Sequence, residues 1–140
     1  MKYFHLSGKV AEQITFGKII APDEVKRELD EFGVDELAKW CNGFPHFFQP
    51  EDTDMQFEVS AIMAHPEHSK LLNVKSTSKY CADVWVIALA KVRRLIVINE
   101  EKIMNPDPNS KKNKIPNVCK DLGIDYMTFL EYVRLQSWKF

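Results

Sequence analysis

The chain has 140 residues, of which 45% are hydrophobic and 11% aromatic, with 19 Lys and Arg against 20 Asp and Glu. This length suits a single domain, and the composition excludes an intrinsically disordered chain. The net charge of −1 excludes a global basic field, so any nucleic-acid contact would use a local patch.

No apolar stretch approaches the roughly 18 residues that a membrane-spanning helix needs, and the N-terminus lacks the apolar core of a secretory signal. The three cysteines, Cys41, Cys81 and Cys119, are odd in number and include no Cys-x-x-Cys pair, which argues against a disulfide framework and a zinc ribbon. We therefore expect buried thiols in a cytoplasmic protein that makes no membrane contact.

The first part of the chain contains three helical patterns. Apolar spacing predicts helices over 3–16 and 22–32, the second opened by its first residue, a proline. Between them, residues 19–20 are interpreted as a short strand or a buried turn. A third helix is predicted over 35–42, with Leu37 facing inward.

The middle of the chain combines a loop with two helices. Residues 43–50 are predicted to form a loop with aromatic anchors, followed by a helix over 51–64. A proline between His65 and His68 favours a helix-ending turn over a metal-binding pair. Residues 80–92 are apolar nearly all round, which is typical of a helix buried on most sides.

The run Leu95-Ile-Val-Ile98 predicts a strand buried on both faces, as in a parallel sheet. A last helix is expected to turn Phe129, Leu130 and Val133 inward. The alternation of helices with short buried strands indicates an α/β fold. Four elements are predicted after the apolar run: a polar loop over 105–114, a helix over 115–122, a strand over 124–127 and a helix over 128–136.

Asp83 enters a helix in which the next seven residues carry no charge. Because an unpaired buried carboxylate costs several kcal/mol, helix N–H groups, a cation or a metal must satisfy it. An ordinary acid at a helix N-terminus is the structural alternative. Glu100 and Glu101 follow the strand predicted over 95–98, at the sheet edge where ligand sites form, although a solvated turn would also explain them.

Glu28 projects beside the apolar stripe of the helix over 22–32. Asp23, Arg27 and Glu31 share another face, which predicts an exposed ion-pair ladder. Glu28 is therefore the acid of this helix expected to lie closest to the core, and the alternative is an ordinary boundary glutamate. Converging carboxylates repel one another unless a cation binds, and hard oxygen ligands favour Mg²⁺ or Mn²⁺ over zinc.

Segments 82–90, 95–102 and 114–123, and less specifically 17–29, resemble a PIN-like family. That family is catalogued as a domain of unknown function and is related to VapC-type toxin ribonucleases. The resemblance implies one PIN-like three-layer domain over 1–140, with a short, mostly parallel sheet flanked by helices. It also implies Mg²⁺-dependent endoribonuclease activity on RNA and inhibition by a cognate antitoxin.

The resemblance assigns the catalytic and metal-binding acids to Glu28, Asp83 and Glu101, with Glu100 as the alternative last ligand. Asn99 stands where the family usually has Thr or Ser, and is assigned to substrate binding. The cations expected to contact RNA phosphates form a loop cluster, and a second small cluster precedes the apolar run; either could also be ordinary solvated surface. The two clusters are Lys111, Lys112 and Lys114, and Lys91, Arg93 and Arg94.

One feature departs from the family pattern: no apolar run ending in Asp precedes residue 17. The family's first strand, normally central in the sheet, and its first acidic ligand are therefore missing. Neighbouring backbone groups would be left unpaired, so we expect a second copy or an antitoxin strand to supply the pairing. The alternative function is a catalytically silent PIN-like module that binds an antitoxin or self-associates.

Overall fold

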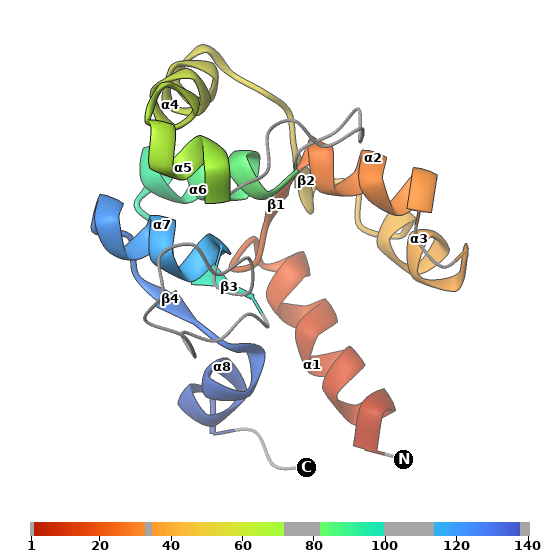
Figure 1. Cartoon of the computed structure of the whole chain (residues 1–140). Coiled ribbons are helices and arrows are strands. Elements are labelled where there is room, and N and C mark those ends of the chain that lie inside the picture. Colours follow the sequence, from red (N-terminus) through yellow and green to blue (C-terminus); the bar gives the residue numbers. More distant parts are fainter. Residues whose placement is uncertain (1, 33–34, 72–81, 100–113, 138–140) are drawn as a thin grey trace.

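The computed structural model describes residues 2–32, 35–71, 82–99 and 114–137. Helices predominate, and short strands form two parallel pairs, which confirms the α/β class (Figure 1). The elements in chain order are α1 (Lys2–Thr15), β1 (Ala21–Pro22), α2 (Asp23–Phe32), α3 (Asp35–Asn42), β2 (Phe48–Gln49), α4 (Thr53–Ala64), α5 (Pro66–Leu71), α6 (Ala82–Arg93), β3 (Val97–Ile98), α7 (Lys114–Leu122), β4 (Tyr126–Met127) and α8 (Phe129–Leu135).

The first strand pair joins β1 to β2. Ala21 lies beside Phe48, and the Ala21 N–H donates to the Phe47 carbonyl at 2.9 Å. Residues 19–20, interpreted as a short strand or a buried turn, lie just before β1, and the loop predicted over 43–50 contains β2. Two-residue strands show no alternation that a sequence pattern could reveal.

The second strand pair joins β3 to β4, with Val97 beside Tyr126 and Ile98 beside Met127. The Val97 N–H donates to the Asp125 carbonyl at 2.9 Å. Strands predicted at 95–98 and 124–127 are therefore present, each reduced to two residues.

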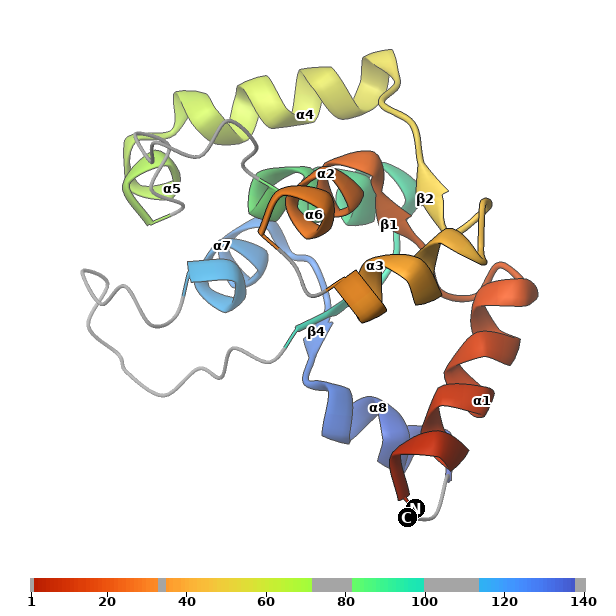
Figure 2. The same cartoon turned by 90° about the vertical axis from the view of Figure 1, so that its right-hand side faces the viewer.

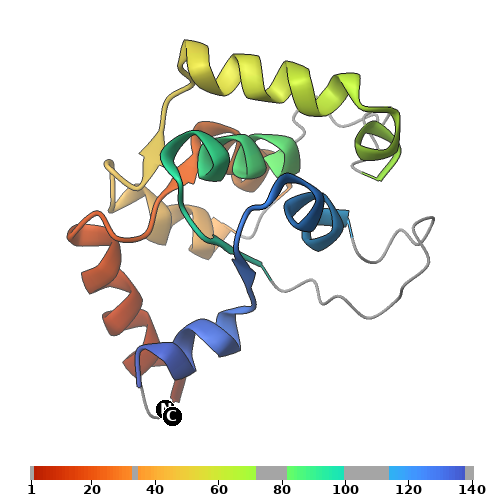
Figure 3. The same cartoon turned by 90° about the vertical axis from the view of Figure 1, so that its left-hand side faces the viewer.

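Helix α6 lies at the centre of the fold, with α4 along one side and α2 and α7 packed against it (Figures 2 and 3). Most of its residues between Ala82 and Ala90 are buried, so the prediction of a helix buried on most sides is confirmed. It contributes to a core of nine buried residues: Ile62, Val84, Ile87, Ala88, Ala90, Val97, Ile115, Val118 and Cys119.

Side-chain caps explain where two of the predicted helices begin. Asp52 Oδ1 accepts a hydrogen bond from the Met55 N–H at 2.8 Å and caps α4. Thr128 and Glu131 form a capping box at the start of α8, each side chain accepting from the other's backbone N–H at 3.2 Å. Such caps satisfy N–H groups that have no acceptor inside the helix.

Two helices end in the same way with different residues. After α7, Gly123 has φ +70° and Ile124 donates its N–H to the Cys119 carbonyl at 2.8 Å. After α6, the Leu95 N–H closes the equivalent bond at 2.8 Å, but the left-handed position, φ +55°, is held by Arg94. A side chain in this conformation costs roughly 1 kcal/mol that glycine avoids.

Arg94→Gly should therefore stabilise the protein by roughly 0.5 kcal/mol, after allowance for the greater freedom of glycine in the unfolded chain. Thermal unfolding should show a Tm about 2 °C higher. Gly123→Ala is the reciprocal variant and should lower the Tm. A lower Tm for Arg94→Gly would mean that the contacts of the arginine side chain outweigh its backbone strain.

Several apolar side chains are more exposed than predicted. Leu37 is 46% exposed, because α3 covers the core only with its last turn, where Cys41 is buried. In α8 the buried residues are Tyr132 and Val133, whereas Phe129 and Leu130 are 36% and 42% exposed. The prediction is correct for Val133 and wrong for the two residues of the first turn.

The apolar run 95–98 is buried only in part, so the prediction of burial on both faces is wrong. Val97 is 2% exposed, but Leu95 and Ile96 are 37% and 47% exposed. The reason is that β3 has β4 on one side and, among the described residues, no strand on the other.

Helix α4 covers one end of the molecule, and α1 and α8 extend from the opposite end (Figures 1, 2 and 3). None of the helices in the described ranges is both long and apolar enough to cross a membrane.

Candidate acidic site at the start of helix α6

A cavity of about 770 Å³ lies between the two strand pairs and holds the predicted site residues that the structure describes with their side chains. Glu28 of α2, Asp83 of α6 and Asn99 after β3 all border it. Residues far apart in the sequence and on separate elements are thus brought to one cavity.

Glu28 makes a tertiary contact with the start of α6. Its Oε1 accepts a hydrogen bond from the Ala82 N–H at 3.0 Å. Ala82 is the first residue of the helix, where N–H groups lack intrahelical acceptors and the helix dipole favours negative charge. This bond gives Glu28 a structural role and engages one of its two carboxylate oxygens.

Asp83 directly follows Ala82 and is half-buried in the first turn of α6. Since Glu28 is bonded to the neighbouring N–H, both carboxylates lie at the N-terminus of this helix. Asn99 is held at the end of β3, where its carbonyl accepts from the Tyr126 hydroxyl at 3.1 Å. The helix dipole makes this end of the cavity favourable for negatively charged side chains.

Glu28 and Asp83 form a donor set of hard carboxylate oxygens. Mg²⁺ is commonly held by one or two carboxylates together with waters and substrate phosphates, so these residues fit Mg²⁺ or Mn²⁺ better than zinc. Across the residues that the structure describes, no three His, Cys, Asp or Glu side chains are placed to hold a metal together.

The remaining predicted site residues are not part of this geometry. Glu100, Glu101, Lys111 and Lys112 lie outside the described residues, as does the side chain of Lys114. Their assignment as the last acid and as phosphate-binding cations therefore stays a prediction.

The cations before the apolar run are engaged within the fold. Lys91 Nζ lies 2.9 Å from Glu58 Oε2, and Arg93 Nη1 donates to Gln49 Oε1 at 2.8 Å. Arg94 borders the cavity. These contacts give Lys91 and Arg93 a structural explanation that does not involve RNA.

A buried acid that sequence reasoning missed lies in the same helix as Glu28. Glu24 is 2% exposed. Arg27 Nη1 contacts Glu24 Oε1 at 3.2 Å and Glu51 Oε1 at 3.1 Å. The predicted ladder of Asp23, Arg27 and Glu31 is therefore wrong, because Arg27 reaches across to the segment before α4.

Burial and a hydrogen bond with Glu51 raise the pKa of Glu24 from 4.5 to about 7. The same hydrogen bond lowers the pKa of Glu51. Glu24 Oε2 is buried and finds no hydrogen-bond donor among the described residues, so a proton on this oxygen lets it donate to Glu51. The spacing of four residues between Glu24 and Glu28, which puts both on one helix face, was the signal that could have found it.

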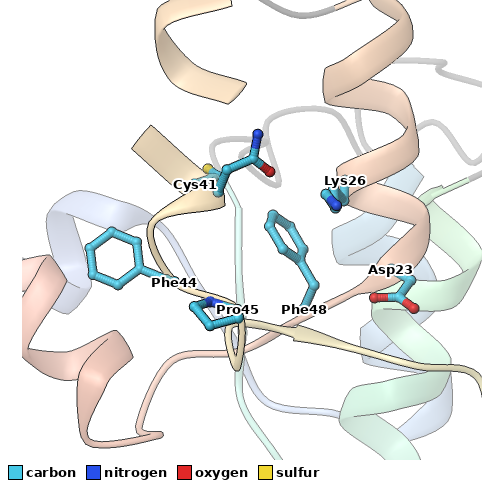
Figure 4. A pocket seen from close by; sticks show the side chains of 7 residues that line it. Asp23, Lys26, Cys41, Phe44, Pro45 and Phe48 are labelled. Atoms are coloured by element: carbon cyan, nitrogen blue, oxygen red, sulfur yellow. The ribbon is translucent and has the colours of Figure 1, made fainter. Parts of the chain in front are cut away.

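A second, smaller cavity of about 210 Å³ lies between α2 and the segment that follows α3 (Figure 4). Asp23 and Lys26 border it on α2, and Phe44 and Phe48 on the other side. Burial raises the pKa of the Cys41 thiol on its wall, which disfavours the nucleophilic thiolate. Thiol catalysis in this cavity is therefore disfavoured.

The two histidines near the end of α4 have a structural explanation. His65 ends α4, and its ring stacks on that of His68 with centroids 4.1 Å apart. His68 is buried, with Nε2 3.2 Å from Asp121 Oδ2 of α7. The pair thus joins α5 to α7 at a helix-ending turn, as the proline between them indicates.

A family model described as "Domain of unknown function (DUF4411)" matches residues 5–140. No curated protein and no solved structure matches the chain. Because the matched region spans nearly all of its residues, the chain belongs to the DUF4411 family.

Proposed function

We propose that the chain is a Mg²⁺-dependent endoribonuclease of the toxin–antitoxin type, built on a PIN-like three-layer domain. One observation carries the proposal: Glu28 and Asp83, from separate helices, border the same cavity as Asn99. The resemblance of segments 82–90, 95–102 and 114–123 to a PIN-like family supports the same assignment.

Glu28 and Asp83 would hold the cation, which, when bound, activates water for attack on a phosphodiester and offsets the charge on the phosphate. The bond from the Ala82 N–H fixes the Glu28 carboxylate before substrate arrives. The N-terminal end of α6 stabilises the charge of Asp83. The Asn99 side-chain amide is suited to donate a hydrogen bond to a phosphate oxygen.

The alternative is a catalytically silent module that binds an antitoxin or a second copy. The separation of the described strands into two pairs favours this alternative, because an incomplete sheet offers edges for another chain.

The test is cleavage of a fluorophore-labelled single-stranded RNA. The wild-type chain should cleave it with Mg²⁺ or Mn²⁺ and stop on addition of EDTA. Asp83→Asn should lower the rate by at least about 100-fold, since it removes the charge of a ligand.

Glu28→Gln separates the structural role from the catalytic one. Glutamine retains an acceptor for the Ala82 N–H, so the free energy of unfolding should fall by less than about 1 kcal/mol. The rate of RNA cleavage should nevertheless fall as much as in Asp83→Asn. Glu31→Gln, at an exposed position of the same helix, is the matched control. Intact RNA together with Mg²⁺ binding by calorimetry would favour the silent module, and intact RNA without Mg²⁺ binding would reject the metal site itself.

A further inference from the structure

The two strand pairs do not join within the part of the chain that the structure describes. β1 pairs with β2 and β3 pairs with β4, each in parallel. In a parallel strand, the backbone groups of alternate residues point to opposite edges. Among these residues, one edge of β1 and one edge of β3 therefore have no strand beside them.

Hydrogen bonds identify the backbone groups on the open edge of β3. Val97 and Asn99 donate their N–H groups toward β4, at 2.9 Å and 3.1 Å. The N–H and C=O groups of Ile96 and Ile98 therefore point away from β4.

The open edge of β1 is found in the same way. Ala21 donates its N–H to the Phe47 carbonyl on the β2 side, so the backbone groups of Ile20 and Pro22 point to the opposite edge. Since proline has no N–H, this edge presents one donor and two acceptors.

The cavity of about 770 Å³ lies between these two edges. Residues 18–22 form one wall and residues 94–99 form the other, and we call this cavity the strand groove. One face of α6 also lines it, with Val86, Leu89 and Ala90. Both strand edges and an apolar helix face thus border one space.

Apolar side chains beside the strand groove are exposed in the isolated chain. Leu95, Ile96 and Phe129 are 37%, 47% and 36% exposed, whereas strands of a parallel sheet are normally buried on both faces. An extended polypeptide is the ligand that would cover this apolar surface and pair with both backbone edges.

The strand groove runs along helix α6, so the length of this helix sets the length of the groove, and charged residues border both of its ends. Asp83 lies in its first turn and Arg94 directly follows its last, a separation of about 16 Å, which corresponds to about five residues of extended strand. Lys18 and Arg94 border the end where β1 and β3 begin, and Glu28 and Asp83 border the other.

We propose that the strand groove binds one extended strand of a partner protein. This strand lies between β1 and β3, parallel to both, and joins the two pairs into a single sheet. It has about five apolar residues. An acidic residue precedes them and a basic residue follows, matching Lys18 and Arg94 at one end and Glu28 and Asp83 at the other.

A partner's strand suits the strand groove because the opposite charges at the two ends of the groove select one direction for an extended chain. A second copy that donated one of its described strands would have to break its own β1–β2 or β3–β4 pair. A partner's strand adds backbone hydrogen bonds and apolar burial without that loss.

The test presents the strand Glu-Val-Ile-Val-Ile-Val-Lys at the C-terminus of a soluble carrier domain and measures its binding to the full chain by calorimetry. We expect binding that weakens at least about tenfold when proline replaces the central valine, because proline cannot donate to a strand edge. Exchanging the terminal Glu and Lys should also weaken binding, because the charges at both ends are then mismatched.

Hydrogen exchange locates the bound strand. The amides of Ile20 and Ile98, which point into the strand groove, should exchange at least about tenfold more slowly in the complex. The Val97 amide, already bonded on the β4 side, should change less.

Variants of the chain give an independent readout. Ile96→Ser should weaken binding at least about tenfold while changing the stability of the free chain little, since Ile96 is already 47% exposed. Phe57→Ser, at a 71% exposed position of α4 outside the groove, is the matched control. Ile98→Pro removes a groove-directed N–H and leaves the bonds of Val97 and Asn99 to the β4 side in place, so it should weaken binding as well.

The proposal would be overturned if the intact strand did not bind, if the proline-interrupted strand bound equally well, or if protection appeared away from Ile20 and Ile98. A dimer of the free chain that Ile96→Ser dissociates in light scattering would also overturn it and assign the groove to a second copy. These measurements need neither RNA cleavage nor Mg²⁺, so their outcome is independent of the proposed function.

Discussion

Glu24→Gln should remove most of the loss of stability that the wild-type protein shows as the pH rises from about 4.5 to 7. The pKa of Glu24 is raised from 4.5 to about 7 by burial and by its bond with Glu51. The folded chain therefore binds more protons than the unfolded chain in this range, and its free energy of unfolding falls as the pH rises. The expected wild-type loss is about 2 kcal/mol.

Glu51, the partner of Glu24, affects the free energy of unfolding in a different pH range. Glu51 has a lowered pKa, so its contribution is complete above the ordinary pKa of 4.5 and is lost only as the pH falls further. The decline between pH 4.5 and 7 thus reports Glu24 alone within this pair. Glutamine resembles the protonated acid and can donate to Glu51, so Glu24→Gln should be more stable than wild type at pH 8.

Urea unfolding of wild type and Glu24→Gln at a series of pH values measures this effect. Glu31→Gln, exposed on the same helix, is the matched control and should follow the wild-type curve. If Glu24→Gln were less stable than wild type at pH 8, the ionised Glu24 carboxylate would be stabilised by Arg27, and the pKa of Glu24 would not be raised.

Ile87→Ala should destabilise the protein by about 3 kcal/mol. Ile87 is 0% exposed and belongs to the core around α6. Removing its side chain loses apolar burial and leaves a cavity that packed neighbours fill only in part. The measurement is the free energy of unfolding in urea, with the slope of the transition unchanged.

Leu37→Ala provides the comparison for Ile87→Ala. Leu37 is 46% exposed on α3, so its removal should change stability by less than about 1 kcal/mol. Equal losses for the two variants would mean that the core around α6 is less tightly packed than its burial indicates.

Most helices were predictable because the spacing of apolar residues along each one shows which of its faces meets the core. Helix α5 was not predicted, because its six residues are too few to show a helical period. The apolar run over 80–92 predicted the buried α6, and the pattern over 51–64 predicted α4, with Met55 and Ile62 buried. The glycine after 115–122 predicted the end of α7. These features depend on contacts between residues three or four positions apart, which a sequence displays directly.

The candidate site was predictable in part. Glu28 stands beside an apolar stripe and Asp83 opens an apolar helix, and the structure brings both to one cavity. The bond from the Ala82 N–H to Glu28, which links the two helices, joins residues 54 positions apart and has no signature in either segment. The burial of Glu24 depends in the same way on Glu51, which approaches from the segment before α4.

By itself, the sequence determined the α/β class, the positions of most helices, and Glu28 and Asp83 as acids beside the core. Only the tertiary structure decided that the strands form two separate parallel pairs, that Leu95 and Ile96 stay exposed, and that a cavity lies between the pairs. The physical reason is that helical hydrogen bonds are local, whereas a two-residue strand gains its partner from a distant segment. Periodicity records which side of an element meets the core, but not which other element lies on that side.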